Sequence, residues 1–217
     1  MNEVQRSKII LKILNRIYPK TPIPLKHRNK FTLLVSVLLS AQTTDVNVNN
    51  VTKSIYPKHN KPEHFVKLGR KKIERLIKSI GIYRVKAKSV YFLSKQLIEK
   101  HKGKVPETFE ELEKLPGVGH KTASVVMSQG FGHSAFPVDT HIHRLAQRWG
   151  LTNGKNVVQT EKDLKRLFPK KFWNKLHLQI IYYGREYCKA RECYGLTCKI
   201  CTTCYPKRKS SIKTNKA

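Results

Sequence analysis

A chain of 217 residues is long enough for one large or two small domains with a buried core, and 44 lysines and arginines against 14 acidic residues give it a formal net charge of +30. An excess of this size repels itself unless a polyanion is a regular partner, so it favours nucleic acid over an acidic protein or a membrane surface. The apolar runs fall far short of the roughly 20 residues that span a bilayer. Because the N-terminus also lacks a signal-peptide pattern, we expect a cytoplasmic, nucleoid-associated protein.

The first half of the chain has the periodicity of successive helices with short connections. Apolar residues recur at helical spacing over residues 4–18, and Pro19 ends that segment. Residues 31–41 are apolar enough for a helix that is buried on nearly every side, and the polar residues 42–45 follow it. Further helices are expected over residues 46–56, around Phe65 and Leu68, over residues 71–80 and over residues 86–100.

The stretch 115–122 predicts a helix, a tight turn and a second helix. Thr108 and Glu111 form a capping box that begins the first helix. Gly117 and Gly119 let the backbone of the turn approach a ligand closely, and the N–H groups at the start of the second helix favour an anion. In so basic a chain, the expected anion is a nucleic-acid phosphate.

The second half of the chain also has helical periodicity. Residues 136–138 are extended, and Asp139 begins a helix whose apolar residues follow the i, i+3, i+4, i+7 pattern. Another capping box begins at Asn156, and a last helix covers residues 172–184. Because no segment has strand periodicity and no internal repeat is found, we predict an all-α fold. The basic residues 206–217 are expected to be disordered.

Two side chains could carry chemistry, and each also has a plainer role. Lys121, at the start of the second hairpin helix, could contact a phosphate, which its spacing alone favours, or attack an electrophilic carbon and form a Schiff base. Asp139 is a very good helix N-cap. Its position after an extended segment also allows its carboxylate to hold a proton and to stabilise a developing cation. The sequence leaves these roles open.

All five cysteines lie in one short segment near the C-terminus, which is typical of metal ligands rather than of disulfides in a secreted domain. Their spacing is C-x4-C-x4-C-x2-C-x2-C. Zinc is the commoner occupant of C-x2-C pairs, but a continuous C-x2-C-x2-C run is typical of loops that wrap an iron–sulfur cluster. We predict a cluster held by Cys198, Cys201 and Cys204 with Cys188 as the fourth thiolate, and we keep zinc as the alternative.

Four motifs together resemble the endonuclease III family, and the resemblance covers nearly the whole chain. The motifs are LSAQTTD at 39–45, GIYRVKA at 81–87, LPGVGHKTA at 115–123 and VDTHIHR at 138–144. They are followed by the cysteine segment, as in the family. An ordered set of motifs is far more specific than any one of them.

The resemblance implies a base excision repair enzyme, a DNA glycosylase and AP lyase that removes oxidised pyrimidines and then nicks the abasic strand. Lys121 matches the family's Schiff-base lysine and Asp139 its catalytic aspartate. A flipped-out nucleotide exposes C1′ to an amine, and the resulting imine permits β-elimination of the 3′ phosphate. Gln42 matches the residue that fills the space left in the duplex, and Ile82 matches an apolar wedge at the opposite strand, although core packing is the plainer role for Ile82.

The resemblance also implies an architecture of two lobes with DNA in the groove between them. A six-helix barrel over residues 22–133 would contain the helix-hairpin-helix at about 108–127, and residues 1–21 with 134–205 would form a lobe with a 4Fe-4S cluster. The hairpin glycines would bind phosphate without reading sequence. We expect a monomer that binds double-stranded DNA containing damaged pyrimidines or abasic sites.

The cysteine spacing departs from the family pattern, which is C-x6-C-x2-C-x5-C. The four cysteines predicted above can be placed on that pattern only with a spacing that is too long before Cys198 and too short before Cys204, and Cys193 is then spare. An altered loop around the same cluster is our preferred account, and a different ligand choice and a zinc site are the alternatives. Two other functions also stand. One is a monofunctional adenine glycosylase, which would lack the hairpin lysine and carry a further C-terminal domain. The other is a non-catalytic module that uses the hairpin only for contact with the DNA backbone.

Overall fold

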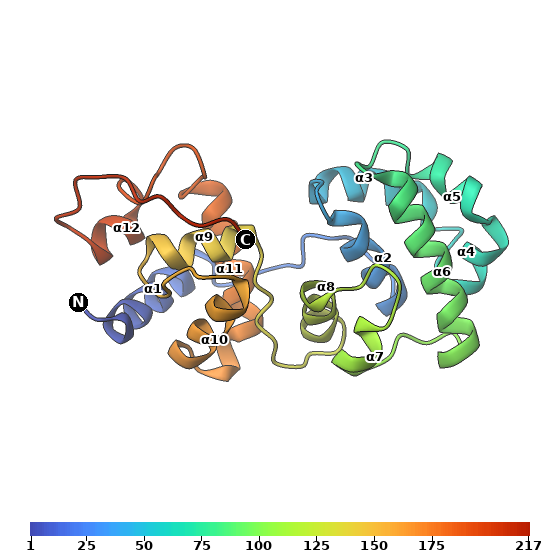
Figure 1. Ribbon diagram of the computed structural model, residues 1–217, viewed down its shortest axis with the longest axis horizontal. Coiled ribbons are helices and arrows are strands. Elements are labelled where there is room, and N and C mark those ends of the chain that lie inside the picture. The colour runs from blue at the N-terminus through green and yellow to red at the C-terminus, as the bar shows by residue number, and fades with distance from the viewer. The chain divides into compact units, whose positions relative to one another are not determined.

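The computed structural model describes every residue from Met1 to Ala217, and the chain forms helices and loops without a strand. The all-α prediction is therefore confirmed. The chain divides into two compact units: Ile23–His133 forms one, and Met1–Pro22 with Ser134–Ala217 forms the other. Figure 1 labels the helices of both. None of these helices has the length and apolar character needed to cross a lipid bilayer.

The unit Ile23–His133 is centred on α2 (Lys30–Ser40), in which residues 31–39 are all buried. The Asn29 side chain caps this helix by accepting a hydrogen bond from the Thr32 N–H, and the Thr32 hydroxyl accepts one from the Asn29 N–H in return. A helix buried on every side forms the centre of a core. The remaining helices of this unit are α3 (Asp45–Ile55), α4 (Pro62–Leu68), α5 (Arg70–Leu76), α6 (Tyr83–His101), α7 (Phe109–Glu113), α8 (His120–Val125) and the π-helix η1 (Val126–Gly130).

The other unit joins the two ends of the chain. Helix α1 (Glu3–Ile17) packs against α11 (Trp173–Glu186). The buried Gln179 side chain of α11 donates hydrogen bonds to the carbonyls of Leu14, at 3.2 Å, and Tyr18, at 2.9 Å, and so satisfies groups at the C-terminal end of α1. The remaining elements are α9 (Thr140–Arg148), α10 (Val157–Leu167), the 3-10 helix η2 (Lys170–Phe172) and α12 (Lys199–Cys204).

Several local features differ from the sequence predictions. Helix α5 ends at Leu76 and not at residue 80, and Asn156 caps α10 without the predicted capping box, because the Gln159 side chain binds Asp163.

Three further differences have a local cause. Helix α6 begins at Tyr83, three residues earlier than predicted, because the chain turns into it through a left-handed Ile82 and not through a side-chain cap. Helix α8 runs directly into the π-helix η1, which apolar periodicity does not distinguish from an α-helix. Helix α12 was not predicted because it lies within the cysteine segment and has no amphipathic repeat.

Residues 206–217, predicted to be disordered, form no helix or strand but make specific contacts within their unit. The Arg208 guanidinium donates a hydrogen bond to the carbonyl of Arg148 at 2.9 Å. The Asn215 backbone N–H donates to the Gln147 side chain at 2.7 Å, and the Gln147 amide donates back to the Asn215 carbonyl at 3.2 Å. Polar partners therefore hold a segment whose composition alone is typical of disorder.

Candidate functional site

The predicted hairpin joins α7 to α8 through a tight turn at residues 114–119. Thr108 caps α7 by accepting a hydrogen bond from the Glu111 N–H at 3.2 Å. The Glu111 carboxylate forms an ion pair instead of returning to the cap, so only half of the predicted capping box is present. The His120 ring stacks on the Phe109 ring, with 5.7 Å between centroids, and this contact holds the start of α8 against α7.

The two glycines of the turn have different physical roles. Gly117 has a φ of +78°, and a Cβ atom there would lie 2.8 Å from the Ser89 side chain and 3.1 Å from Leu38. The fold therefore requires glycine at this position. Gly119 has an extended backbone, and a Cβ there would meet nothing within 4 Å. The fold does not need glycine at 119, so its open side is free for close approach of a ligand.

Lys121 is the second residue of α8, and its side chain is exposed. It makes no ion pair with any of the chain's carboxylates. Gly119 provides no side-chain cap for α8, so the first N–H groups of that helix are left to other partners. The arrangement permits both roles considered for Lys121: phosphate contact and nucleophilic attack.

Asp139 belongs to the other unit, where it is the N-cap of α9. Its Oδ1 accepts a hydrogen bond from the Ile142 N–H at 2.8 Å. The residue is partly exposed, and its second carboxylate oxygen has no hydrogen-bond partner in the protein. The capping role is therefore present, and one oxygen is left for a second role.

Gln42 and Ile82, the two residues expected to enter the DNA duplex, both have left-handed backbones, with φ of 55° and 50°. Such a conformation costs about 1–3 kcal/mol per residue and is a genuine outlier for β-branched isoleucine. Ile82 is 51% exposed, which excludes the core-packing role. Strain of this kind persists only where the surrounding structure imposes it, and it concentrates at functional positions.

Lys86 links the two loops that carry these residues, and the sequence analysis did not identify it. Its side chain is only 3% exposed, and its ammonium donates a hydrogen bond to the carbonyl of Ala41, the residue before Gln42. The loop that contains Gln42 is thereby tied to the first turn of α6, next to Ile82. A signal was available, because Lys86 occupies the same apolar stripe as Val90, at helical spacing i, i+4.

Replacing Lys86 with methionine should change how stability depends on pH. Burial lowers the pKa of Lys86 from its ordinary value of 10.5, so the folded state releases this proton first as pH rises. Between the two pKa values the unfolded chain holds more protons, and the free energy of unfolding therefore rises with pH in that window. Urea unfolding at pH 8 and pH 10 should show the native protein gaining stability relative to Lys86→Met.

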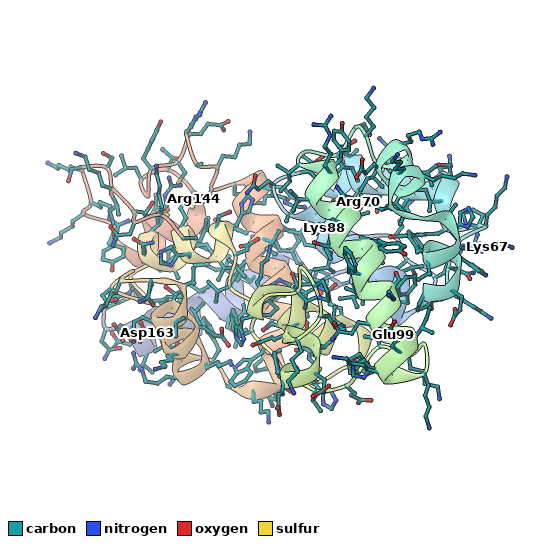
Figure 2. The ribbon with its side chains drawn as sticks, turned by 45° about the vertical axis from the view of Figure 1, so that its right-hand side comes forward. Lys67, Arg70, Lys88, Glu99, Arg144 and Asp163 are labelled. Atoms are coloured by element: carbon teal, nitrogen blue, oxygen red, sulfur yellow. The ribbon has the colours of Figure 1, made fainter.

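The matched control is Lys88→Met, two residues along the same helix, where the side chain is exposed (Figure 2). It should show no pH-dependent difference from the native protein. A Lys86→Met difference that stays constant between the two pH values would contradict the prediction.

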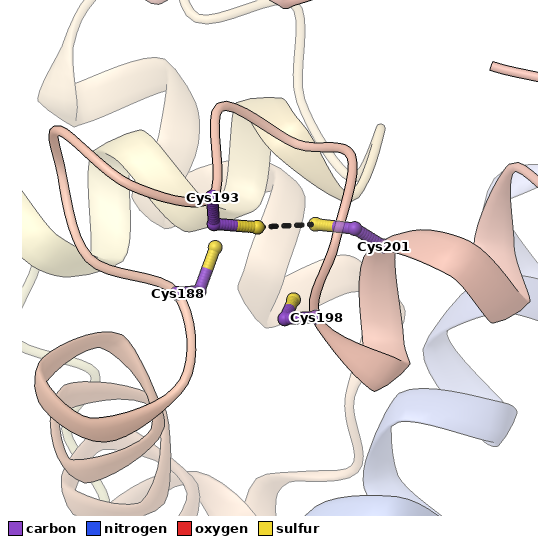
Figure 3. A group of neighbouring side chains, drawn as sticks. All are labelled: Cys188, Cys193, Cys198 and Cys201. Atoms are coloured by element: carbon purple, nitrogen blue, oxygen red, sulfur yellow. Dashed lines mark hydrogen bonds between the residues drawn. The ribbon is translucent and has the colours of Figure 1, made fainter. Parts of the chain in front are cut away.

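Four of the five cysteines converge in a buried group in the C-terminal segment. The sulfur atoms of Cys188, Cys193, Cys198 and Cys201 all lie within 4.8 Å of one another. Figure 3 shows the four side chains pointing toward a common centre, with Cys193 and Cys201 3.9 Å apart. Four buried thiols whose sulfur atoms converge are a donor set that could hold a soft or borderline metal.

The composition of this group differs from the prediction at one position. Cys193, which the sequence analysis left spare, is included, and Cys204, which was predicted to be a ligand, is not. Cys204 is the last residue of α12, and burial raises the pKa of its thiol to about 11 despite the positive charges of Arg6 and Arg208. The spacing of the cysteines could not decide between Cys193 and Cys204. The loop between Cys188 and Cys198 is long enough for the Cys193 thiol to reach the other three.

Arg148 holds the loop that follows Cys188. The buried Arg148 guanidinium donates to the carbonyls of Lys189 and Ala190, each at 2.8 Å, and lies 3.4 Å from the Cys188 sulfur. Hydrogen bonds from the Cys188 and Cys201 thiols lower the pKa of Cys198. The neighbouring thiols and burial raise the pKa values of Cys188 and Cys201 in the same group.

Comparison with known proteins identifies the family to which a chain with this geometry belongs. Residues 35–170 match the family described as HhH-GPD superfamily base excision DNA repair protein. The chain is 40% identical over 214 residues to endonuclease III of Bacillus subtilis (strain 168), covering 98% of each protein. The chain belongs to the endonuclease III family.

Other members of the endonuclease III family match over a similar extent. The Escherichia coli (strain K12) endonuclease III is 41% identical over 215 residues, which covers 98% of this chain and 100% of that one. A solved structure of a trapped endonuclease III–DNA covalent intermediate, an estranged-adenine complex, superposes with a TM-score of 0.88 at 40% identity, covering 92% of this chain and 94% of that one. Membership of the endonuclease III family makes the chain a base excision repair enzyme with DNA glycosylase and AP lyase activity.

Proposed function

We propose that this enzyme removes oxidised pyrimidines from duplex DNA through Lys121 and then cleaves the abasic strand by β-elimination. The observation that carries the proposal is the exposed Lys121 at the start of α8, beside a glycine turn whose open side admits a phosphate. A nucleotide held by its backbone at this turn would have its sugar beside the amine once the base is flipped out.

The covalent step begins with the neutral amine of Lys121. Its nitrogen attacks C1′ of the damaged nucleotide, the bond from C1′ to the base breaks, and the base leaves with the bonding pair. Opening of the sugar ring gives an imine between Nζ and C1′. The imine acidifies the C2′ proton, whose loss expels the 3′ phosphate and nicks the strand. Water then hydrolyses the imine and restores the amine.

Asp139 is proposed as the partner of Lys121 in this reaction. The amine must lose a proton as the carbon–nitrogen bond forms, and positive charge develops on the sugar as the base leaves. The second carboxylate oxygen of Asp139, which the helix cap does not use, could accept that proton and stabilise that charge. The cap itself fixes the orientation of the carboxylate, because Oδ1 is held by the Ile142 N–H.

Gln42 and Ile82 are proposed to occupy the duplex where the base has left. Support comes from their exposure and from their strained backbones, which aim both side chains outward from loops tied together by Lys86. An apolar side chain between base steps lowers the cost of unstacking them.

A 4Fe-4S cluster is proposed for the cysteine group, with zinc as the alternative. The donor set is four thiols, which suits either centre. We infer that Cys188, Cys193, Cys198 and Cys201 are the ligands, because these sulfurs converge. When bound, the cluster would cross-link the loop between α11 and α12 and stabilise its unit.

Exchanging single cysteines for serine should identify the ligands. Cys193→Ser should lose most of the bound metal, whereas Cys204→Ser, an equally buried neighbour outside the group, should retain it. The measurement is iron, zinc and sulfide content, with the visible absorption spectrum, on protein purified without oxygen. Loss of metal from Cys204→Ser with retention in Cys193→Ser would restore the family-like ligand set.

Borohydride reduction in the presence of damaged DNA tests the proposed function as a whole. Reduction should trap a covalent complex on a duplex with one oxidised pyrimidine and none on the intact duplex, because only the damaged base is cheap to flip and release. Equal affinity for both duplexes without trapping or strand cleavage would favour a non-catalytic DNA-binding module.

A further inference from the structure

A basic hollow lies on the surface of the unit Ile23–His133, beside the loop that carries Ile82. Its volume is about 370 Å³. It adjoins a second hollow of about 680 Å³ that shares three of its residues and adds Arg70 and Lys72. The cations of these helices are exposed, among them Arg70 and Lys88, which Figure 2 labels. The first hollow is lined by Lys71, Glu74, Arg75, Lys78, Tyr83 and Arg84.

The positive charge of this hollow is not neutralised within the protein. Glu74 is its one carboxylate, and the Arg70 side chain binds that carboxylate at 2.9 Å. The four cations that line the hollow make no ion pair with a carboxylate. Elsewhere in the same unit, exposed lysines do find such partners, as in the pairs Lys95–Glu99 and Lys114–Glu110. The hollow therefore concentrates positive potential, which a bound anion would relieve.

The cations of the hollow are arranged in a row. Lys71, Arg75 and Lys78 follow one face of α5 and its C-terminal turn at the spacing i, i+4, i+7, so successive charges lie about one helical turn, roughly 5 Å, apart. The Arg84 guanidinium lies 5.4 Å from the centroid of the Tyr83 ring, which limits its motion. A linear polyanion fits a row of charges better than a single small anion does.

The exposed apolar residues beside the row restrict what that polyanion is. Ile82 is 51% exposed and Val85 is 62% exposed, and both are adjacent in sequence to the residues of the hollow. Apolar side chains next to phosphate-binding cations match a nucleic acid, in which base surfaces lie beside a charged backbone. An acidic protein segment would leave the strained Ile82 without a function.

We propose that this hollow, the α5–α6 hollow, binds consecutive phosphates of the DNA strand opposite the lesion. The proposal rests on the proposed function, in which Ile82 enters the duplex, and on the resemblance, which implies that Ile82 does so at the opposite strand. The hairpin turn would hold the damaged strand, and the α5–α6 hollow would hold its complement. The protein would then bind the backbone of each strand at a separate site, and both strands would be held in place while the base pair between them opens.

The salt dependence of DNA affinity tests the proposal. Two neutral substitutions, Arg75→Gln with Arg84→Gln, should lower the slope of log affinity against log salt by about 2, because each phosphate contact contributes roughly 0.9. The loss of affinity between about 50 and 200 mM salt should then be roughly tenfold smaller than for the native protein. Lys71→Gln with Lys78→Gln, from the same row, should give a similar change.

The matched control is Lys58→Gln with Lys67→Gln, which removes the same charge from two exposed positions of the same unit outside the hollow. Its slope should stay close to the native value. An unchanged slope in both hollow variants, or an equal change in the control, would overturn the proposal.

Neutral phosphate analogues identify the strand. A methylphosphonate placed opposite the lesion should weaken binding by the native protein but not by Arg75→Gln with Arg84→Gln, whereas one in the damaged strand should weaken both. The reverse pattern would overturn the strand assignment. Borohydride trapping of the native protein tests the proposed function separately. If trapping succeeds while the slopes do not change, only the α5–α6 hollow is disproved.

Discussion

Replacing Lys121 with alanine should abolish covalent trapping and lower the rate of strand cleavage at an abasic site by at least about 1,000-fold. Loss of a nucleophile removes the covalent route altogether, whereas loss of acid–base assistance alone costs roughly 10²–10⁴-fold. The fold should survive, because Lys121 is exposed and exposed substitutions usually change the free energy of unfolding by less than about 0.5 kcal/mol. The measurements are single-turnover cleavage of an abasic duplex, borohydride trapping and thermal unfolding.

Lys114→Ala is the matched control, since it removes one positive charge from the same hairpin without touching the proposed nucleophile. Lys114 is exposed and pairs with Glu110 and Glu111. Its loss should weaken DNA binding slightly through charge and leave trapping intact. A trapped adduct that persists in Lys121→Ala would show that another amine is the nucleophile.

Replacing Asp139 with asparagine should lower base removal by roughly 10²–10⁴-fold while leaving stability nearly unchanged. Asparagine is as good an N-cap as aspartate, so its side-chain oxygen can still accept the hydrogen bond from Ile142. It cannot accept a proton or balance a cation. Asparagine at this position thus separates the capping role from the chemical one.

Asp139→Ala completes the comparison because it removes both roles. It should be as inactive as Asp139→Asn and, in addition, less stable by about 1 kcal/mol from loss of the cap. Release of the excised base and thermal unfolding would be measured in parallel. Full activity in Asp139→Asn would mean that the residue is a helix cap and nothing more.

Local signals made much of the fold predictable. The hairpin follows from a cap at Thr108 and from a left-handed turn that only Gly117 fits. The central helix follows from an apolar run that leaves no polar face. Both depend on residues that are neighbours in sequence, so neither needs knowledge of the rest of the chain.

Tertiary geometry explains what the sequence could not give. Ile82 has a left-handed backbone, which a β-branched residue rarely adopts, so local propensity could not predict it. The choice of Cys193 over Cys204 depends on the path of a loop, and several sets of four thiols satisfy the spacing equally well. Lys86 interrupts an otherwise apolar stripe. This pattern predicts that a buried group accepts a hydrogen bond from the lysine, but it does not identify that group as the Ala41 carbonyl.

The discontinuity of one unit has a consequence for synthesis on the ribosome. The unit Ile23–His133 is continuous and can fold as soon as its residues emerge. Helix α1 is made before that unit, but its buried Ile10 and Leu14 belong to a core whose other helices all follow residue 133. The apolar face of α1 therefore stays uncovered until more than a hundred later residues have been translated. Nascent chains stalled before α11 should thus be the form of this protein that most needs a chaperone.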